Sequence, residues 1–299
     1  MSFSIPSPPV SVWYLGPIPI RAYAIALLLG IILAIYIGDR RYRRMGGPKD
    51  TYIDVAVWAV VLGIIFARIY YVVSTPDAYF GPNGNPIDAF KIWEGGIAIL
   101  GSLMGGALGI FIGLKRRGLR FAPFVDALAP GLILAQAVGR FGNYFNQELF
   151  GTPTDLPWGL EIDAAHMPPG YPEGTLFHPT FLYEQIWNVI GAVVIVVLER
   201  KLRLKGGQVI LTYLMWYSFG RFWIEIIRTD FAHSFGLLRF NSWAALLVFV
   251  LAVVLMVVAT KLRRTHPELS NIFVNEKDQP ADKEGTAAGV SGNQISEVN

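Results

Sequence analysis

The sequence has no cysteine and few charged residues, and each shortage excludes a class of protein. Without cysteine the chain forms no disulfide, offers no thiolate to a metal and carries no cysteine nucleophile of its own. Charged residues make up 16% of the 299 residues and hydrophobic residues 53%, whereas soluble domains carry about 25% charged residues. This composition predicts a polytopic membrane protein.

Several local motifs are absent as well. There is no G-x-S-x-G and no H-E-x-x-H sequence, which argues against a serine hydrolase or a zinc peptidase. Residues 1–16 have no basic stretch before an apolar run, so we expect no cleaved signal peptide. The net charge of +3 is small, and we expect no nucleic-acid partner, no cofactor and no metal site.

Seven apolar stretches approach or exceed the roughly 20 residues that a membrane-spanning helix needs. They cover residues 18–37, 52–73, 92–114, 121–138, 181–198, 209–227 and 242–260. The fold class expected is therefore an all-α polytopic membrane protein with seven transmembrane helices. Residues 1–264 form this domain, and its loop 151–180 is either a lid or cap or an inert connector. Residues 265–299 are polar and without apolar periodicity, which predicts a disordered tail.

The loop charges predict the orientation of these helices. Sixteen basic residues follow the first, third, fifth and seventh stretches, and only five lie in the segments on the other side. Basic residues near helix ends favour the cytoplasmic side of a membrane. We therefore expect the N-terminus outside, the C-terminus and its tail in the cytoplasm, and the loop 151–180 outside.

Polar residues from several of these helices fall at one depth. Arg68 lies 16 residues along the second stretch and Arg221 lies 12 along the sixth, or about 24 Å and 18 Å into a hydrocarbon core about 30 Å thick. The residues at the outer ends of the other helices are Tyr23, Glu94, Arg140, Tyr183 and Glu184. Ionisable groups inside a membrane are expensive, so this layer predicts a functional site.

The sixth stretch is the most informative. Tyr217, Arg221, Glu225 and Arg228 are spaced four, four and three residues apart, so they share one helix face. They form either an ion-pair ladder that neutralises itself or part of a pocket for an anion. Guanidinium groups match phosphate oxygens with two hydrogen bonds, which favours a pocket for an outer-leaflet phospholipid.

Glycines in the third stretch have two different interpretations. Gly101, Gly105, Gly109 and Gly113 recur every fourth residue, which predicts close packing of a neighbouring helix. Paired Gly95 and Gly96 near the start of the stretch allow a ligand to approach or break the helix.

A transporter or channel for an anionic solute or lipid is the alternative function. It would explain intramembrane arginines, but it also predicts an internal repeat, which the sequence does not display. A structural or receptor protein would leave the shared polar layer unexplained.

The densest polar stretch follows the fourth apolar run and reads Gly139-Arg140-Phe141-Gly142-Asn143-Tyr144-Phe145-Asn146-Gln147-Glu148-Leu149-Phe150-Gly151. Such groups at the end of a membrane helix indicate function, although Arg140 alone could snorkel to lipid headgroups. The stretch resembles the signature of the bacterial prolipoprotein diacylglyceryl transferases. Weaker resemblances extend over roughly residues 15 to 262, namely Arg21-Ala22-Tyr23, Ala67-Arg68-Ile69-Tyr70-Tyr71, Trp93-Glu94-Gly95-Gly96, His178-Pro179-Thr180-x-x-Tyr183-Glu184 and Tyr217-x-x-x-Arg221-x-x-x-Glu225-x-x-Arg228.

The resemblance implies a multi-pass enzyme of the bacterial cytoplasmic membrane. Such enzymes move the diacylglyceryl group of phosphatidylglycerol onto the lipobox cysteine of a prolipoprotein signal peptide, forming a thioether and releasing glycerol-1-phosphate. By resemblance, Arg140 and Arg221 bind the phosphate, and Tyr23 and Tyr217 lie near the reacting centre. The remaining residues implied in substrate binding are Arg68, Glu94, Gly95, Gly96, Asn143, Asn146, Glu148, Gly151, Tyr183, Glu184, Glu225 and Arg228.

The proton acceptor stays open. Many family members carry a histidine in the third helix after the paired glycines, and the matching position here is Leu100. His178 is the other candidate base, although a single loop histidine is more often structural. A thiolate stabilised by arginines without a dedicated base is the third option.

Overall fold

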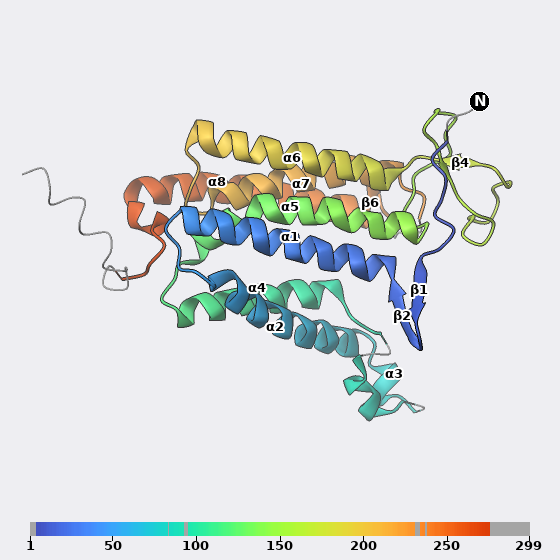
Figure 1. Ribbon diagram of the computed structural model, residues 1–299, viewed down its shortest axis with the longest axis horizontal. Helices are drawn as coiled ribbons and strands as arrows, with labels where there is room; N and C mark the ends of the chain where they lie inside the picture. The colour runs from blue at the N-terminus through green and yellow to red at the C-terminus, as the bar shows by residue number, and fades with distance from the viewer. Residues whose placement is uncertain (1–3, 83, 93–94, 231–233, 237, 276–299) are drawn as a thin grey trace, which may run out of the picture.

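The computed structural model describes residues 4–82, 84–92, 95–230, 234–236 and 238–275 (Figure 1). Glu94 therefore lies outside the described residues. In chain order the elements are β1 (Val12–Leu15), β2 (Ile18–Arg21), α1 (Ala22–Arg44), α2 (Thr51–Ser74), α3 (Asp77–Phe80), η1 (Pro86–Phe90), α4 (Ile99–Arg116), α5 (Phe121–Phe145), β3 (Leu160–Glu161), β4 (Leu176–Phe177), α6 (Thr180–Leu202), α7 (Gln208–Ile227), β5 (Ser234–Phe235), β6 (Leu238–Arg239), α8 (Phe240–Thr265) and η3 (Pro267–Ser270).

The helices confirm an α-helical membrane protein. Six of the eight α-helices in the described residues are long and apolar enough to cross a membrane, namely α1, α2, α4, α5, α6 and α8. The prediction of seven spans also included α7, which has 20 residues but carries Gln208, Arg221 and Glu225. Its polar residues lower its hydropathy, and six candidate spans therefore stand where seven were predicted.

The helices form two groups. In the larger group, α5 lies in the middle and packs against α1, α6 and α7, while α8 packs on α7. In the smaller group, α2 and α4 pack on each other and lie beside α1 (Figure 1). A buried cluster that includes Tyr42, Tyr52, Leu114 and Phe124 joins the two groups where α1 ends and α2 begins.

The glycine stripe of α4 explains how closely α2 approaches. Gly101, Gly105, Gly109 and Gly113 are all buried. A Cβ at Gly101 would collide with the carbonyl oxygen of Phe66 on α2, and Cβ atoms at Gly105 and Gly109 would meet carbonyl oxygens one and two turns earlier in α2. The structural interpretation of the stripe is confirmed, because only hydrogen fits between the two backbones.

The start of two helices differs from the prediction for local reasons. Residues Ile18 to Arg21 pair with Val12 to Leu15 as an antiparallel hairpin, so α1 begins at Ala22 rather than at residue 18. Gly95 and Gly96 have φ angles of 97° and 74°, which right-handed helices do not allow, and α4 begins only at Ile99.

The end of α5 also differs. The apolar run stops near residue 138, but the helix continues to Phe145. Arg140 and Asn143 therefore lie on the helix itself and not in a segment that follows it, which fixes their directions through the helix geometry.

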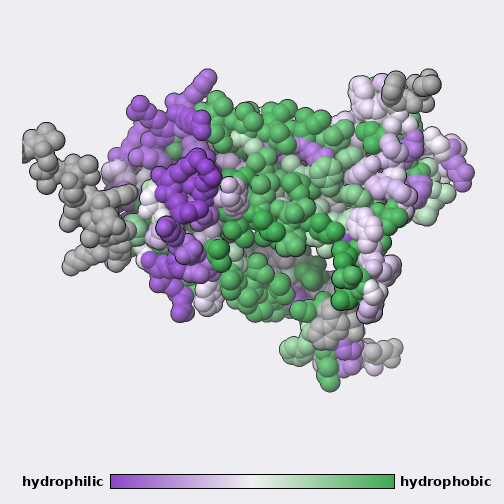
Figure 2. Space-filling view, in the orientation of Figure 1, coloured by the Kyte–Doolittle hydropathy of each residue, from purple (hydrophilic) through white to green (hydrophobic). Residues whose placement is uncertain are grey.

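The two ends of the bundle have different chemistry. Hydrophilic residues cover the end where α1 and α6 terminate, and apolar residues cover the middle of the helices on the face that Figure 2 shows. Of the tail 265–299 that was expected to be disordered, residues 276–299 lie outside the described residues, and residues 265–275 contain η3 and a bridge between Phe273 and Leu119. The amide of Arg120 donates to the carbonyl of Ile272 at 2.8 Å, and Ile272 is buried in the cluster that joins the helix groups. The position of residues 265–275 thus depends on Arg120, which is far away in the sequence, so local composition does not predict it.

Candidate functional site

Charged residues from three helices meet at the opposite end of the bundle. Glu184 in the second turn of α6 forms ion pairs with Arg140 near the end of α5 and with Arg221 on α7. The Arg221 Nη1 atom lies 3.2 Å from the Glu184 Oε1 atom. The three helix ends lie together on the side of the β hairpins (Figure 1). One carboxylate thus bridges the two arginines that were predicted to bind phosphate.

A second chain of hydrogen bonds holds Arg140 from within its own segment. The Nη1 atom of Arg140 donates to the Oδ1 atom of Asn143 at 3.0 Å, one helical turn later. The Nδ2 atom of Asn143 donates to the Oε1 atom of Glu148 at 2.8 Å, and Asn146 donates to the same oxygen at 3.3 Å. The signature residues therefore form one connected unit around Arg140.

The turn after α5 is strained and tied to the long loop. Gln147 and Leu149 have φ angles of 50° and 61°, a left-handed conformation that costs about 1–2 kcal/mol for a residue with a side chain. The side chain of Gln147 compensates by donating to Asp163 at 2.7 Å and accepting from its amide at 2.9 Å. Hydrogen bonds from His166 and from Gln147 hold the pKa of Asp163 below its usual range. This turn directs Glu148 back towards Asn143.

The predicted face of α7 is present as an ion-pair ladder. The Oε2 atom of Glu225 lies 2.7 Å from Nη2 of Arg221 and 3.3 Å from Nη1 of Arg228. We use the term arginine–glutamate network for Arg140, Glu184, Arg221, Glu225 and Arg228. The predicted shared face is confirmed, and Glu184 extends the ladder to a second helix.

Three further residues near the end of α7, which the sequence did not indicate, join this network. Asp230 pairs with Arg228 at 2.7 Å, Arg239 lies 3.2 Å from the Glu225 Oε1 atom, and Asn241 donates to the same oxygen at 2.9 Å. Asp230 follows α7, Arg239 lies in β6 and Asn241 lies in the first turn of α8, so no single helical periodicity relates them to Glu225.

Exposure distinguishes the arginines from their carboxylate partners. The side chains of Arg140 and Arg221 are 17% and 19% exposed, whereas those of Glu184 and Glu225 are 7% and 0% exposed. The carboxylates lie behind the guanidinium groups. Arg140 and Arg221 are therefore more accessible than the two carboxylates that pair with them, while Glu148 and Asp230 expose negative charge at the same end of the bundle.

His178 and Tyr183 form a separate hydrogen-bonded group at the start of α6. The His178 Nδ1 atom lies 3.0 Å from the Tyr183 Oη atom, which also accepts a 3.0 Å hydrogen bond from Trp158 Nε1. Gly151 donates its amide to the carbonyl of His178 at 2.9 Å, and a Cβ there would lie 2.9 Å from the carbonyl oxygen of Ile227. Gly151 thus allows the signature segment to pass between His178 and the end of α7.

The two predicted tyrosines lie next to this region. The ring of Tyr23 on α1 occupies the space that a side chain at Gly142 would need, one residue before Asn143. Tyr217 lies one turn before Arg221 on α7, and its ring stacks on Tyr213 with centroids 6.0 Å apart. Tyr23 thus packs on α5 close to the signature residues, and Tyr217 packs against Tyr213 on its own helix.

The structure assigns Arg68 to a different cluster. Its guanidinium group donates to the carbonyl oxygens of Ala89 at 2.8 Å, Gly95 at 2.6 Å and Gly96 at 3.0 Å, and also to that of Asp88. Among the described residues, no hydrogen bond or ion pair joins it to the arginine–glutamate network. Arg68 thus uses its guanidinium donors to hold the segment before α4 in place.

Leu100 occupies the position that matches the family's histidine. It lies on the first turn of α4 and its side chain is 54% exposed. An aliphatic side chain accepts no proton, so general-base chemistry from this position is excluded.

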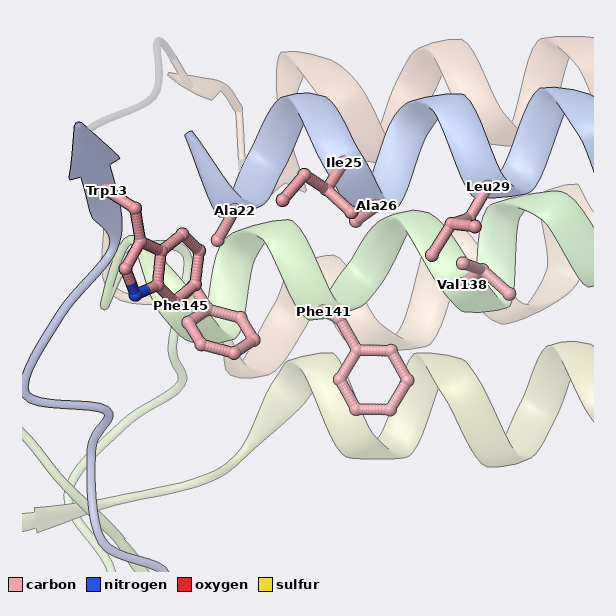
Figure 3. Close-up of a pocket in the computed structure, with 8 residues that line it drawn as sticks. All are labelled: Trp13, Ala22, Ile25, Ala26, Leu29, Val138, Phe141 and Phe145. Carbon is pink, nitrogen blue, oxygen red and sulfur yellow. The ribbon is translucent and has the colours of Figure 1, made fainter. Parts of the chain in front are cut away.

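An apolar pocket of about 230 Å³ lies on another face of α5. Its lining comes from the hairpin, α1 and α5 and consists of Trp13, Ala22, Ile25, Ala26, Leu29, Val138, Phe141 and Phe145 (Figure 3). On a helix, Phe141 and Phe145 share a face from which Arg140 points away. The pocket is therefore distinct from the arginine–glutamate network.

The fold and the site define an α-helical integral membrane protein with a charged site at one end of its bundle. Residues 9–258 match the sequence profile of the family described as prolipoprotein diacylglyceryl transferase. The chain belongs to the prolipoprotein diacylglyceryl transferase family and is a transferase with that activity.

Two relatives illustrate the extent of the similarity. The chain is 44% identical over 299 residues to phosphatidylglycerol–prolipoprotein diacylglyceryl transferase 2 of Streptomyces coelicolor, covering 97% of this chain and 93% of that protein. It is 47% identical over 255 residues to the corresponding transferase of Cutibacterium acnes, covering 85% and 86%. With the family shown, the transporter alternative is set aside.

Proposed function

We propose that this transferase moves the diacylglyceryl group of phosphatidylglycerol to the lipobox cysteine of a prolipoprotein signal peptide in the bacterial cytoplasmic membrane. The names of the relatives include phosphatidylglycerol and prolipoprotein. The physical support comes from the two partly exposed arginines, because an anionic headgroup is the part of this lipid that they would recognise.

In this proposal, the lipid phosphate binds between Arg140 and Arg221. The observation that carries it is the position of Glu184, whose carboxylate already bridges both guanidinium groups. Arg140 keeps Asn143 and Arg221 keeps Glu225 when a phosphate takes over the remaining donors. Each arginine thus remains oriented while it exchanges one carboxylate contact for phosphate oxygens.

The chemistry follows from this placement. The cysteine thiolate attacks the carbon of the diacylglyceryl group that is bonded to the phosphate oxygen. A C–S bond forms there, and the bond between this carbon and the phosphate oxygen breaks. The electron pair stays on the phosphate oxygen, so negative charge develops next to Arg140 and Arg221, where positive charge stabilises it. Glycerol-1-phosphate leaves and carries away the charge.

The remaining residues have supporting roles in this proposal. Asn143, Asn146 and Glu148 hold Arg140 and contact the headgroup, while Tyr23 and Tyr217 donate hydrogen bonds near the reacting carbon. His178 holds the loop through Tyr183. The positive field of the two arginines favours the thiolate form of a cysteine held beside them.

The proposed topology has seven spans, with the N-terminus outside. In it α7 also crosses the membrane, because it lies between α5, α6 and α8, which shield its polar residues from lipid. The arginine–glutamate network then faces the outer leaflet, where a secreted precursor presents its cysteine.

The test is an assay with purified protein in vesicles that contain phosphatidylglycerol and a lipobox peptide. The expected product is a peptide that gains the mass of one diacylglyceryl group, together with one equivalent of glycerol phosphate. A peptide with serine in place of cysteine should stay unmodified. Transfer from phosphatidylcholine vesicles at the same rate would contradict recognition of the phosphatidylglycerol headgroup.

A further inference from the structure

The Glu225 carboxylate pairs with Arg221, Arg228 and also Arg239, which has no role in the proposed reaction so far. This carboxylate is fully buried, with 0% of its side chain exposed. Its Oε2 atom contacts Arg221 and Arg228, while its Oε1 atom contacts Arg239 at 3.2 Å and Asn241 at 2.9 Å. Three arginines thus contact one carboxylate, each of its oxygens has a different set of partners, and two of the arginines, Arg228 and Arg239, also pair with Asp230.

Arg239 is held in a fixed position just before α8. Its Nη1 atom donates to the carbonyl of Arg228 at 2.8 Å, and its Nη2 atom donates to the carbonyl of Asp230 at 2.6 Å. The same Nη2 atom pairs with the Asp230 carboxylate at 3.1 Å. A guanidinium group with all its donors in use has little freedom to move, so the charge of Arg239 is preorganised next to Glu225.

The charge balance shows what Arg239 contributes. Arg221 contacts two carboxylates, Glu184 and Glu225. If Arg239 lost its charge, Glu225 would keep Arg221 and Arg228 as its cationic partners, and Arg228 is shared with Asp230. The field of Glu225 at Arg221 would then be less compensated, and an anion approaching Arg221 would meet stronger repulsion in a poorly solvated place.

We propose that Arg239 is a positioning residue for the transfer reaction, which acts on the lipid phosphate through Glu225 and Arg221. By holding the Oε1 atom of Glu225, it leaves Arg221 with a net positive field towards the headgroup. The inference rests on the proposed function, in which Arg221 is a phosphate ligand. Arg239 makes no contact with substrate in this proposal and lies outside the motif on α7.

The experiment measures transfer rates against the mole fraction of phosphatidylglycerol in vesicles, at saturating lipobox peptide. Arg239→Gln keeps the length and a hydrogen-bond donor but removes the charge. We expect it to raise the KM for phosphatidylglycerol about tenfold and to change kcat by less than about threefold. Arg263→Gln is the matched control, because Arg263 lies at the other end of α8 and donates to Gln208; it should leave both constants unchanged.

A double variant distinguishes this role from simple stabilisation of the loop. In a Glu225→Gln background the negative charge that Arg239 compensates is gone, so adding Arg239→Gln should change the KM by less than about twofold. Equal effects of Arg239→Gln in both backgrounds would overturn the inference, as would an unchanged KM in the single variant. If Arg239→Gln does not fold, Arg239→Lys replaces it. Lysine keeps the charge on which the inference depends, although not the geometry of the guanidinium group, so a KM within about threefold of the native value is expected. A KM raised tenfold or more would overturn the inference.

Arg221→Lys, measured in parallel, distinguishes failure of the inference from failure of the proposed function. If Arg221→Lys is impaired while Arg239→Gln behaves like the control, only the role of Arg239 is refuted. If Arg221→Lys keeps the native dependence on phosphatidylglycerol, the phosphate site itself is refuted, and the inference falls with it.

Discussion

Replacing Arg140 by lysine tests the proposed phosphate site most directly. Arg140 uses two different nitrogens, Nη2 towards Glu184 and Nη1 towards Asn143. Lysine keeps the positive charge but has a single nitrogen on a flexible chain, so it cannot reproduce both contacts and still present a pair of donors to phosphate. The variant therefore separates the geometry of the guanidinium group from its charge.

The size of the effect follows from the contacts that are lost. One hydrogen bond to a charged group contributes about 1.5–3 kcal/mol, and about 1.36 kcal/mol corresponds to a tenfold change in rate. If the lost bond strengthens as charge develops on the leaving phosphate, Arg140→Lys should reduce kcat/KM about 10- to 150-fold. Its thermal stability should fall less, because the 17% exposed side chain can still pair with Glu184 through its charge.

The assay is the transfer of diacylglyceryl to a lipobox peptide, followed by mass spectrometry, with the melting temperature measured on the same preparation. Arg263→Lys serves as the control, since Arg263 lies at the opposite end of the bundle and pairs with Gln208. Near-native activity of Arg140→Lys would refute the reasoning, because a point charge would then suffice at this position.

Three further predictions concern the base, the topology and the packing of α4. His178→Ala should reduce the rate less than about 100-fold, which is the lower end for loss of a general base. We expect this small effect because the ring of His178 bonds to Tyr183 and thus has a structural role. A larger loss that is rescued at high pH would identify His178 as the base. A reporter fused near Gly170 should report the outside and one after Arg117 the cytoplasm, and a cytoplasmic signal at Gly170 would exclude the proposed topology. Gly105→Ala should lower the melting temperature, because its Cβ would collide with the Leu62 carbonyl, and such overpacking costs about 1–3 kcal/mol of stability. The control Gly106→Ala should leave the melting temperature unchanged, because the nearest contact of its Cβ is an ordinary one at 3.9 Å. Equal effects of the two substitutions would contradict the packing argument.

The sequence alone determined the class of the protein and most of its helices. Long apolar runs identify helices because a membrane-embedded backbone must satisfy its hydrogen bonds within the segment. The four-residue spacing of glycines on α4 and of charged residues on α7 predicted shared faces, since both follow from the helical repeat. The residues of the signature stretch also carried the resemblance to the family, which the comparison with relatives then confirmed.

The tertiary structure decided which charges meet. Glu184 bridges Arg140 and Arg221 only because the ends of α5 and α7 lie beside the start of α6, and no local pattern records that arrangement. For the same reason the sequence assigned Arg239 to the outer side but not to the site, because it reaches Glu225 on α7 from strand β6. Arg68 shows the opposite case: the sequence grouped it with the other arginines by depth, and the fold directs it to backbone carbonyls instead. Depth along a helix follows from counting residues, but direction and partners depend on how the helices pack.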